Sequence, residues 1–157
     1  MLNKPIKISL ISDTHNLMRP EAKRALAGVD RILHAGDICD SHVLGELREI
    51  APVVVVRGNN DHGPSAESIP ATEAVKFGSV VIYMLHDLGE LDLDPQTAGF
   101  HVVISGHSHR PLVERKGGVL CVNPGSAGPR RFKFPISIGL LEIERGRVEA
   151  RLLTLQP

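Results

Sequence analysis

The chain has 157 residues, of which 42% are hydrophobic and 23% are charged, a composition typical of one ordinary folded domain with an ample core. Lys plus Arg and Asp plus Glu are equal at 18 each, which argues against a nucleic-acid or anionic-membrane partner that would need a charged surface. Residues 1–5 are short and polar and no stretch is apolar enough to span a bilayer, so we expect a cytoplasmic protein with a single domain over residues 1–157.

The first apolar segment, residues 6–11, alternates in hydrophobicity and predicts a strand that ends just before Asp13 and His15. A strand that delivers Asp and His at its carboxyl end is a common way to build a site, because the sheet holds the backbone rigid. The alternative is that Asp13 only caps a helix or forms a turn. Pro20 then suits the first turn of a structural helix over residues 20–27.

Two more predicted strands also end in polar loops. Residues 31–34 lead into Gly36 and Asp37, where the glycine permits a tight bend from which the carboxylate projects. The β-branched run 53–56 is expected to be a strand covered on both faces, and it leads to Asn59. Three successive βα-type units with polar ends predict a sheet whose strand ends converge on one site.

The segment between these two strands is interpreted as structural. Asp40 or Ser41 can cap a helix that runs to Ile50. His34 lies inside its strand, so we interpret it as a packed or supporting residue rather than a direct ligand. His42 is interpreted as a surface residue of the helix.

From Thr72 onward the hydrophobic pattern is that of strands. The predicted strands are residues 72–77, 80–85, 102–105, 113–116, 119–122, 136–143 and 147–155. Glycine-containing turns join the first pair and the pair 113–116 and 119–122 into hairpins. Residues 94–99 are expected to form a short helical piece. No linker or repeat marks a domain boundary.

Residues 105–109, Ser-Gly-His-Ser-His, place two histidines directly after a buried strand. Residues two apart in an extended segment point the same way, and a bend at Gly106 can spread His107 and His109 toward neighbouring points. Either histidine alone would be interpreted as a hydrogen-bonded loop residue. Metal binding is favoured because the preceding predicted strand also ends at a histidine, His86.

The expected site therefore consists of seven polar residues at strand ends: Asp13, His15, Asp37, Asn59, His86, His107 and His109. Seven nitrogen and oxygen ligands without sulfur exceed what one tetrahedral ion needs, and they suit two ions that each keep an open position. Asp37, central in order, is the candidate for a bridging carboxylate. Two ions about 3.5 to 4 Å apart are the apparatus for in-line displacement at phosphorus.

These motifs resemble the calcineurin-like metallophosphoesterases, and among them the short bacterial and archaeal phosphodiesterases of the YfcE type. The resemblance rests on Asp13-Thr14-His15, Gly36-Asp37, Gly58-Asn59-Asn60-Asp61, His86, Gly106-His107-Ser108-His109 and Asn123-Pro124-Gly125-Ser126, in family order. It implies an α/β fold, a four-layer αββα sandwich of two mixed β-sheets flanked by helices.

The resemblance also implies a dinuclear site. One ion would take Asp13, His15, Asp37 and His109, and the other Asp37, Asn59, His86 and His107. The family commonly works with manganese, and iron, nickel, zinc or magnesium occur among its members. We therefore expect a metal-dependent phosphodiesterase that cleaves phosphodiester or activated phosphoester bonds of a small substrate, with a metal-bridging hydroxide as nucleophile.

Two positions depart from the family pattern. Many members carry a histidine directly after the metal-binding Asn, where it protonates the leaving oxygen and is oriented by the following acidic residue; here Asn60 precedes Asp61. His62 can substitute as general acid, although an exposed loop histidine is the plainer interpretation. Asp87 stands where glycine is usual, and its carboxylate either hydrogen-bonds His86 or is solvated. The candidate catalytic residues are Asp37, Asn59, Asp61 and His62.

The competing hypothesis is a catalytically weak protein-interaction scaffold of the same fold, as in a retromer subunit that resembles this family. Every expected ligand position is filled by a suitable residue, which favours the enzyme. A nuclease is disfavoured by the neutral charge balance and by the scarcity of stacking residues, since Trp is missing and Tyr83 is the only Tyr. Arg130 or Arg131 can clamp a phosphate oxygen or form a solvated turn. The number of subunits stays open, a homo-oligomer included.

Overall fold

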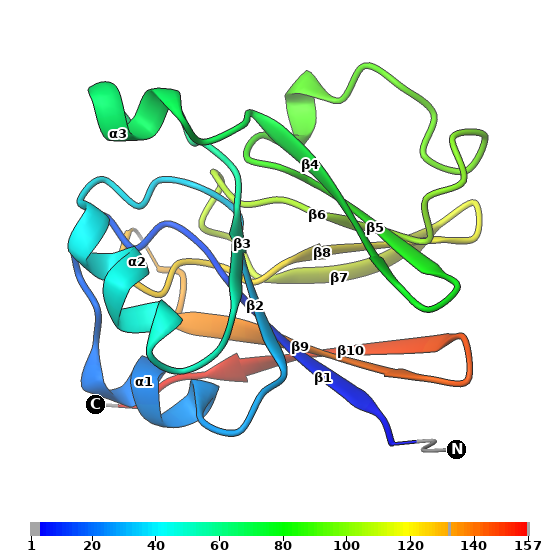
Figure 1. Cartoon of the computed structure of the whole chain (residues 1–157), viewed down its shortest axis with the longest axis horizontal. Helices are drawn as coiled ribbons and strands as arrows, with labels where there is room; N and C mark the ends of the chain where they lie inside the picture. Colours follow the sequence, from blue (N-terminus) through cyan, green and yellow to red (C-terminus); the bar gives the residue numbers. More distant parts are fainter. Residues whose placement is uncertain (1–3, 132, 157) are drawn as a thin grey trace.

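Two five-stranded β-sheets make up most of the molecule, and the computed structural model describes residues 4–131 and 133–156 (Figure 1). The first sheet consists of β1 (Ile6–Ile11), β2 (Arg31–His34), β3 (Val53–Val55), β9 (Ser137–Glu144) and β10 (Arg147–Thr154). The second consists of β4 (Thr72–Phe77), β5 (Val80–Leu85), β6 (Val102–Ile104), β7 (Leu112–Lys116) and β8 (Val119–Asn123). The strand orders are β10-β9-β1-β2-β3 and β4-β5-β6-β8-β7, with parallel and antiparallel neighbours in both. The expected fold class is confirmed.

Three hydrophobic clusters separate the layers of the fold. The largest lies between the two sheets and includes Leu10 of β1, Ile82 of β5 and Ile104 of β6. A second lies between the first sheet and the helices α1 (Pro20–Leu26) and α2 (Ser41–Arg48). The third is smaller and lies on the other face of β5, where Leu91 packs against the cluster. The order of layers is therefore helices, sheet, sheet and the β5–β6 connection.

The helices follow the sequence signals closely. The Asp40 side chain caps α2 by accepting a hydrogen bond of 3.1 Å from the backbone N–H of His42. The helix buries its three apolar residues and ends at Arg48, two residues before the predicted end. A single further turn, α3 (Pro64–Glu67), follows β3. Within the described residues no helix has the length and hydrophobicity needed to cross a membrane.

The helical piece predicted at residues 94–99 is wrong, because this segment forms turns. The Asp94 carboxylate accepts a hydrogen bond of 3.2 Å from the backbone N–H of Gln96 and caps a single turn, in which Ala98 N–H donates to Asp94 O at 3.0 Å. Gly99 then adopts a φ of +87°, which ends the turn. The helical turn of this connection lies earlier, in the 3₁₀ helix η1 (Leu88–Glu90).

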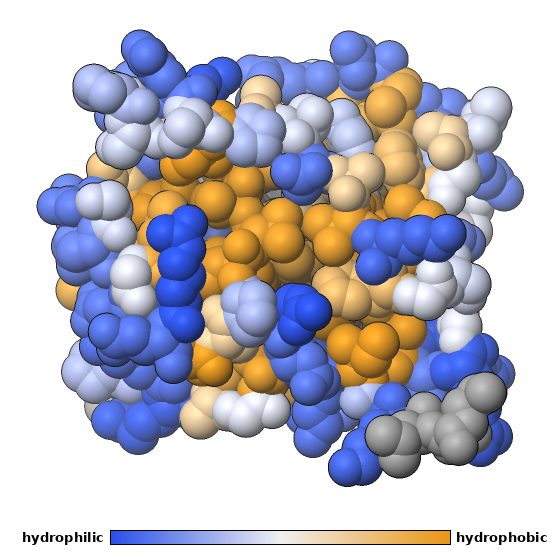
Figure 2. Space-filling model, in the orientation of Figure 1, coloured by the Kyte–Doolittle hydropathy of each residue, from blue (hydrophilic) through white to orange (hydrophobic). Residues whose placement is uncertain are grey.

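The third strand packs on both faces as predicted, yet it is only half-buried. Val54 packs against the cluster between the sheets, whereas Val53 and Val55 pack against the cluster beneath the helices. β3 is an edge strand because the chain leaves the first sheet after it, and a run of valines does not reveal how many neighbouring strands follow. Figure 2 shows hydrophobic side chains across the middle of the face that carries this edge.

Parallel pairing brings the polar strand ends together. β1, β2 and β3 run parallel in the first sheet, and β5, β6 and β8 run parallel in the second. Backbone hydrogen bonds join the loops that follow them, from Asp13 N–H to Gly36 O (3.0 Å) and from Gly106 N–H to His86 O (2.9 Å). Ala127 N–H donates to Ser12 O at 3.1 Å and so links the two sheets at this edge.

Candidate metal centre

Five of the seven expected ligands form one compact cluster: Asp13, His15, Asp37, His86 and His109. The Asp37 Oδ2 atom lies 3.6 Å from His15 Nε2 and 3.3 Å from His86 Nε2. The Asp13 Oδ1 atom lies 3.4 Å from His109 Nε2 and 3.7 Å from His15 Nε2. Two ligand atoms that are each about 2.1 Å from a shared ion are about 3 to 3.5 Å apart, so these separations suit coordination.

Unpaired buried atoms show that the cluster fits cations. Asp13 is fully buried and His86 is 5% exposed. Asp13 Oδ1, His15 Nε2 and His86 Nε2 are buried and have no hydrogen-bond partner within the described residues. A buried polar atom without a partner is costly, and a divalent ion accepts both carboxylate oxygen and imidazole nitrogen as ligands. The residues present therefore fit the metal ions that the sequence implies.

Hydrogen bonds leave the ligating atoms free. Asp13 Oδ2 accepts from Ser12 Oγ (2.7 Å) and from the backbone N–H of His107 (3.1 Å), so Oδ1 remains available. His86 Nδ1 donates to the carbonyl oxygen of Ala35 at 2.7 Å, which leaves Nε2 facing Asp37. A histidine ligand oriented through its other ring nitrogen is the usual arrangement at metal sites.

The backbone at the site is strained. Five expected ligands adopt the left-handed conformation with φ between 43° and 70°: Asp13, His15, Asp37, His107 and His109. Outside glycine this conformation is uncommon, and it persists only where the surroundings enforce it, often at functional sites. Close packing is part of that enforcement, because a Cβ atom on Gly58 would collide with Asp37 and one on Gly106 would collide with Ser12.

Neighbouring histidines keep both central carboxylates ionised. Burial alone raises the pKa of Asp13, but contacts with His109 and His15 outweigh it and hold that pKa far below its usual range. Burial also opposes ionisation of Asp37, yet the contact with His86 and a hydrogen bond from the Asn60 backbone lower its pKa to about 2. Two carboxylates that stay charged at neutral pH provide the negative charge that divalent ions require.

The other two expected ligands, Asn59 and His107, lie at the exposed side of the cluster. His107 Nδ1 is 3.1 Å from Asn59 Oδ1, and the His107 ring meets the His86 ring edge-on with centroids 5.2 Å apart. The Asp87 carboxylate lies 3.9 Å from His107 Nε2, so it faces His107 and not His86 as the sequence suggested. Asp87 also accepts a hydrogen bond from Gly89 N–H and so caps η1.

The loop after β3 is bound to the loop that carries Asp37 through hydrogen bonds that the sequence did not predict. Asp61 accepts three backbone hydrogen bonds of 2.7 to 2.9 Å, from Asp37, Gly58 and Cys39, and these contacts tie two loops together. Asn60 donates to both carboxylate oxygens of Asp37, through its backbone N–H and its side-chain amide. Sequence reasoning treated Asn60 only as a missing acid, because its position after Asn59 gives no sign of this contact.

The proposed general acid is not in this cluster. His62 is exposed, and its ring forms no hydrogen bond or ion pair in the part of the chain that the structure describes. Its catalytic role, like that of Asp61, stays a prediction.

His34 is a supporting residue, as its place inside β2 indicated. Its Nδ1 accepts a hydrogen bond of 3.0 Å from Gly36 N–H, and its Nε2 lies 3.0 Å from Thr14 Oγ1. Because Nδ1 is an acceptor, the proton of the neutral ring belongs on Nε2. His34 thus connects the loop that carries Asp13 with the loop that carries Asp37.

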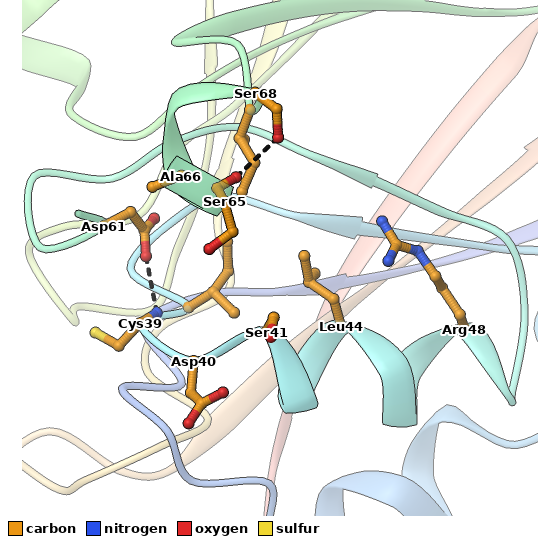
Figure 3. Close-up of a pocket in the computed structure, with 11 residues that line it drawn as sticks. Cys39, Asp40, Ser41, Leu44, Arg48, Asp61, Ser65, Ala66 and Ser68 are labelled. Carbon is orange, nitrogen blue, oxygen red and sulfur yellow. Dashed lines mark hydrogen bonds between the residues drawn. The ribbon is translucent and has the colours of Figure 1, made fainter. Parts of the chain in front are cut away.

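A pocket of about 190 Å³ borders the cluster on the α2 side. Figure 3 shows Asp61 and Cys39 at one end of it, joined by the hydrogen bond from Cys39 N–H, and Arg48 projecting from α2 at the other end. Cys39 Sγ also lies 3.6 Å from His15 Nδ1, so this residue forms the wall between the pocket and the cluster.

Comparison with known proteins identifies the family. The profile of the calcineurin-like phosphoesterase superfamily domain matches residues 6–146. The chain belongs to this superfamily. Its resemblance to the family, expected from the motifs, is confirmed, and the superfamily's dependence on divalent metals agrees with the cluster described above.

Individual proteins and solved structures match most of the chain. A protein of Methanocaldococcus jannaschii described as a probable metallophosphoesterase is 32% identical over 170 residues, covering 99% of this chain and 85% of its own. The structure of an archaeal phosphodiesterase superposes with a TM-score of 0.77 at 25% identity, covering 94% of this chain and 98% of the other. Vacuolar protein sorting 29 of Cryptosporidium parvum shares the fold, with a TM-score of 0.77 at 20% identity and coverage of 98% and 99%.

Proposed function

We propose that this metallophosphoesterase is a phosphodiesterase with two divalent ions that share Asp37. The observation that carries the proposal is the position of Asp37 Oδ2 between two unpaired histidine nitrogens, 3.6 Å from His15 Nε2 and 3.3 Å from His86 Nε2. The likeness to an archaeal phosphodiesterase over 94% of the chain supports the choice of reaction.

Bound ions supply an activated water molecule and neutralise charge on the phosphoryl oxygens. The protein's own residues hold and orient the ligands. Asn60 fixes both oxygens of Asp37, and Ser12 fixes one oxygen of Asp13. Asn59 and His107 are exposed beside this buried cluster, so a phosphoester approaches the site from their side. We therefore assign them to the more open of the two ion sites.

Manganese is the proposed metal. The expected ligands are carboxylates, imidazoles and one amide oxygen, without a thiolate. Carboxylate and carbonyl oxygens suit magnesium and manganese, whereas imidazoles suit iron, nickel and zinc, so this mixed set favours a metal that accepts both kinds of ligand.

Diesters with good leaving groups are the proposed substrates, because Asn60 takes the position where many members carry the acid histidine, and His62 is exposed and outside the cluster. A leaving group of low pKa departs without protonation, whereas an alkoxide needs an acid. His62 remains the candidate acid for diesters with alkoxide leaving groups, which are cleaved more slowly.

The test is an assay of the manganese-loaded protein on bis(p-nitrophenyl) phosphate and on p-nitrophenyl phosphate. We expect faster cleavage of the diester and loss of that activity in Asp37→Asn. Glu149→Gln, which removes an exposed carboxylate from β10, is the matched control and should behave as the wild type. Faster cleavage of the monoester would contradict the proposed specificity.

The alternative is a binding scaffold, which the fold shared with vacuolar protein sorting 29 also accommodates. The enzyme and the scaffold are distinguished by the metal content of the purified protein. Protein purified without chelators should contain a transition metal if it is the enzyme. Metal-free protein that also remains inactive after manganese is added would favour the scaffold.

A further inference from the structure

A second pocket, of about 290 Å³, opens at the exposed side of the metal centre. Its lining includes His86 and His107 at the metal end and Tyr83, Asp87, Glu90 and Asp92 elsewhere. We call this space the acidic pocket. It is the room available to one arm of a diester whose phosphoryl group lies at the metal centre.

Shared residues connect the acidic pocket to the metal centre, because the expected ligands Asn59, His86 and His107 are among its lining residues. His86, one of its lining residues, is 5% exposed, and its Nε2 has no hydrogen-bond partner in the described part of the chain. The same nitrogen lies 3.3 Å from Asp37 Oδ2. A molecule in the acidic pocket is therefore adjacent to the candidate ions.

The charges of the acidic pocket are unbalanced. Asp87, Glu90 and Asp92 contribute three carboxylates, and Arg57 is the only Lys or Arg among the lining residues. Within the described residues, the carboxylates of Glu90 and Asp92 form no hydrogen bond or ion pair. The lining therefore carries two more carboxylates than Lys or Arg side chains. Three carboxylates repel an anion and attract a cation.

Tyr83 adds an aromatic surface to these charges. It is stacked on Phe100, with ring centroids 4.7 Å apart, and the stacking fixes its orientation. Aromatic faces attract ammonium groups, most strongly quaternary ones, and nearby carboxylates add to this attraction. The phosphoryl anion does not suit such surroundings, but an ammonium group does.

We propose that the acidic pocket binds the ammonium group of an amino-alcohol arm, so that the preferred substrates are phosphodiesters of amino alcohols. This inference rests on the phosphodiesterase activity proposed above. The two ends of the site thus divide the substrate, with the anionic phosphoryl group at the divalent ions and the cationic group between Tyr83 and the carboxylates.

Two chromogenic diesters that differ only by one charge provide the test. They are p-nitrophenyl 2-(trimethylammonio)ethyl phosphate and its isostere with an uncharged arm, p-nitrophenyl 3,3-dimethylbutyl phosphate. Since the leaving group is the same, we expect kcat values within about twofold and a KM at least about fivefold lower for the diester with the ammonium arm, an advantage that salt reduces. Equal KM values would overturn the proposal.

The double variant Glu90→Gln/Asp92→Asn should abolish the difference in KM between the two diesters. Glu142→Gln/Glu149→Gln, which removes two carboxylates from β9 and β10, is the matched control and should keep it. A preference that survives in Glu90→Gln/Asp92→Asn would contradict a role for the acidic pocket.

A binding measurement separates this inference from the proposed activity. Calorimetric titration of manganese-loaded protein with 2-(trimethylammonio)ethyl phosphate and with 3,3-dimethylbutyl phosphate requires no turnover. Tighter binding of the monoester with the ammonium arm supports the acidic pocket even if neither diester is cleaved, a result that would refute the phosphodiesterase alone. Equal affinity for the two monoesters refutes the ammonium site whatever the activity.

Discussion

The candidate metal centre has a buried half and an exposed half, and the protein holds them differently. Asp13 and Asp37 are almost fully buried, strained in backbone conformation and fixed by several hydrogen bonds. Asn59 and His107 are exposed and contact each other at 3.1 Å. The difference indicates that the buried half is preorganised for a cation, whereas the exposed half can adjust when an ion and a substrate bind.

The largest effect should follow a change in the buried half. Asp13→Asn replaces the carboxylate whose Oδ1 faces His109 at 3.4 Å, so it removes a charge and places an amide among ligand nitrogens. We expect turnover of an aryl diester to fall by about a thousandfold, as when a group that stabilises charge in the transition state is lost. Elemental analysis of the purified variant should show less than half the metal of the wild type.

The pH dependence of the free energy of unfolding tests whether His34 supports the buried half. Burial lowers the pKa of His34 to about 4 from its usual 6.5, and the neutral ring accepts the hydrogen bond from Gly36 N–H. The unfolded chain therefore binds the extra proton between pH 6.5 and 4, and the free energy of unfolding falls as pH falls through that range. The loss amounts to about 3 kcal/mol in full and about 2 kcal/mol by pH 5.

Urea unfolding of chelator-treated wild type and His34→Gln at pH 7.5 and pH 5 measures this contribution. The stability difference between the two proteins should shrink by about 2 kcal/mol at the lower pH, because glutamine does not titrate. The same pH dependence in both proteins would show that His34 is not buried in the neutral form.

A change in the exposed half should be milder. His107→Ala removes a ligand that is 44% exposed and leaves the cluster around Asp13 and Asp37 intact. We expect manganese affinity to fall by about tenfold, which lies at the low end of losses seen when metal-site residues are changed. Calorimetric titration measures this affinity. If His107→Ala lost as much manganese affinity as Asp13→Asn, the buried and exposed halves would not differ.

The smallest effect is expected at His62, which is exposed and forms no side-chain hydrogen bond within the described residues. Since p-nitrophenolate leaves without a proton, His62→Gln should change turnover of bis(p-nitrophenyl) phosphate by less than about twofold. Cleavage of a dialkyl diester, whose alkoxide leaving group needs an acid, tests whether His62 is the general acid. A selective loss of its cleavage would identify His62 as the general acid, and equal behaviour of both substrates would exclude that role.

The sequence predicted the buried half well because strand ends are visible in it. Runs of apolar residues marked where β1, β2 and β6 end, and parallel strands carry their carboxyl ends to one edge. The structure then placed Asp13, Asp37 and His109 together. What depends on loop conformation was not predictable: Asn60 holding Asp37, and Asp87 facing His107. Left-handed residues turn the loops that these side chains meet, at Asp37 and His107, and residue spacing does not encode that.

Counting bound metal shows whether two ions share Asp37. Chelator-stripped wild type and Asp37→Asn are loaded with manganese, freed of excess ion and analysed for metal per chain. We expect two ions per wild-type chain and at most one in Asp37→Asn. Wild-type protein that retains no manganese, or Asp37→Asn that retains two ions, would contradict this expectation.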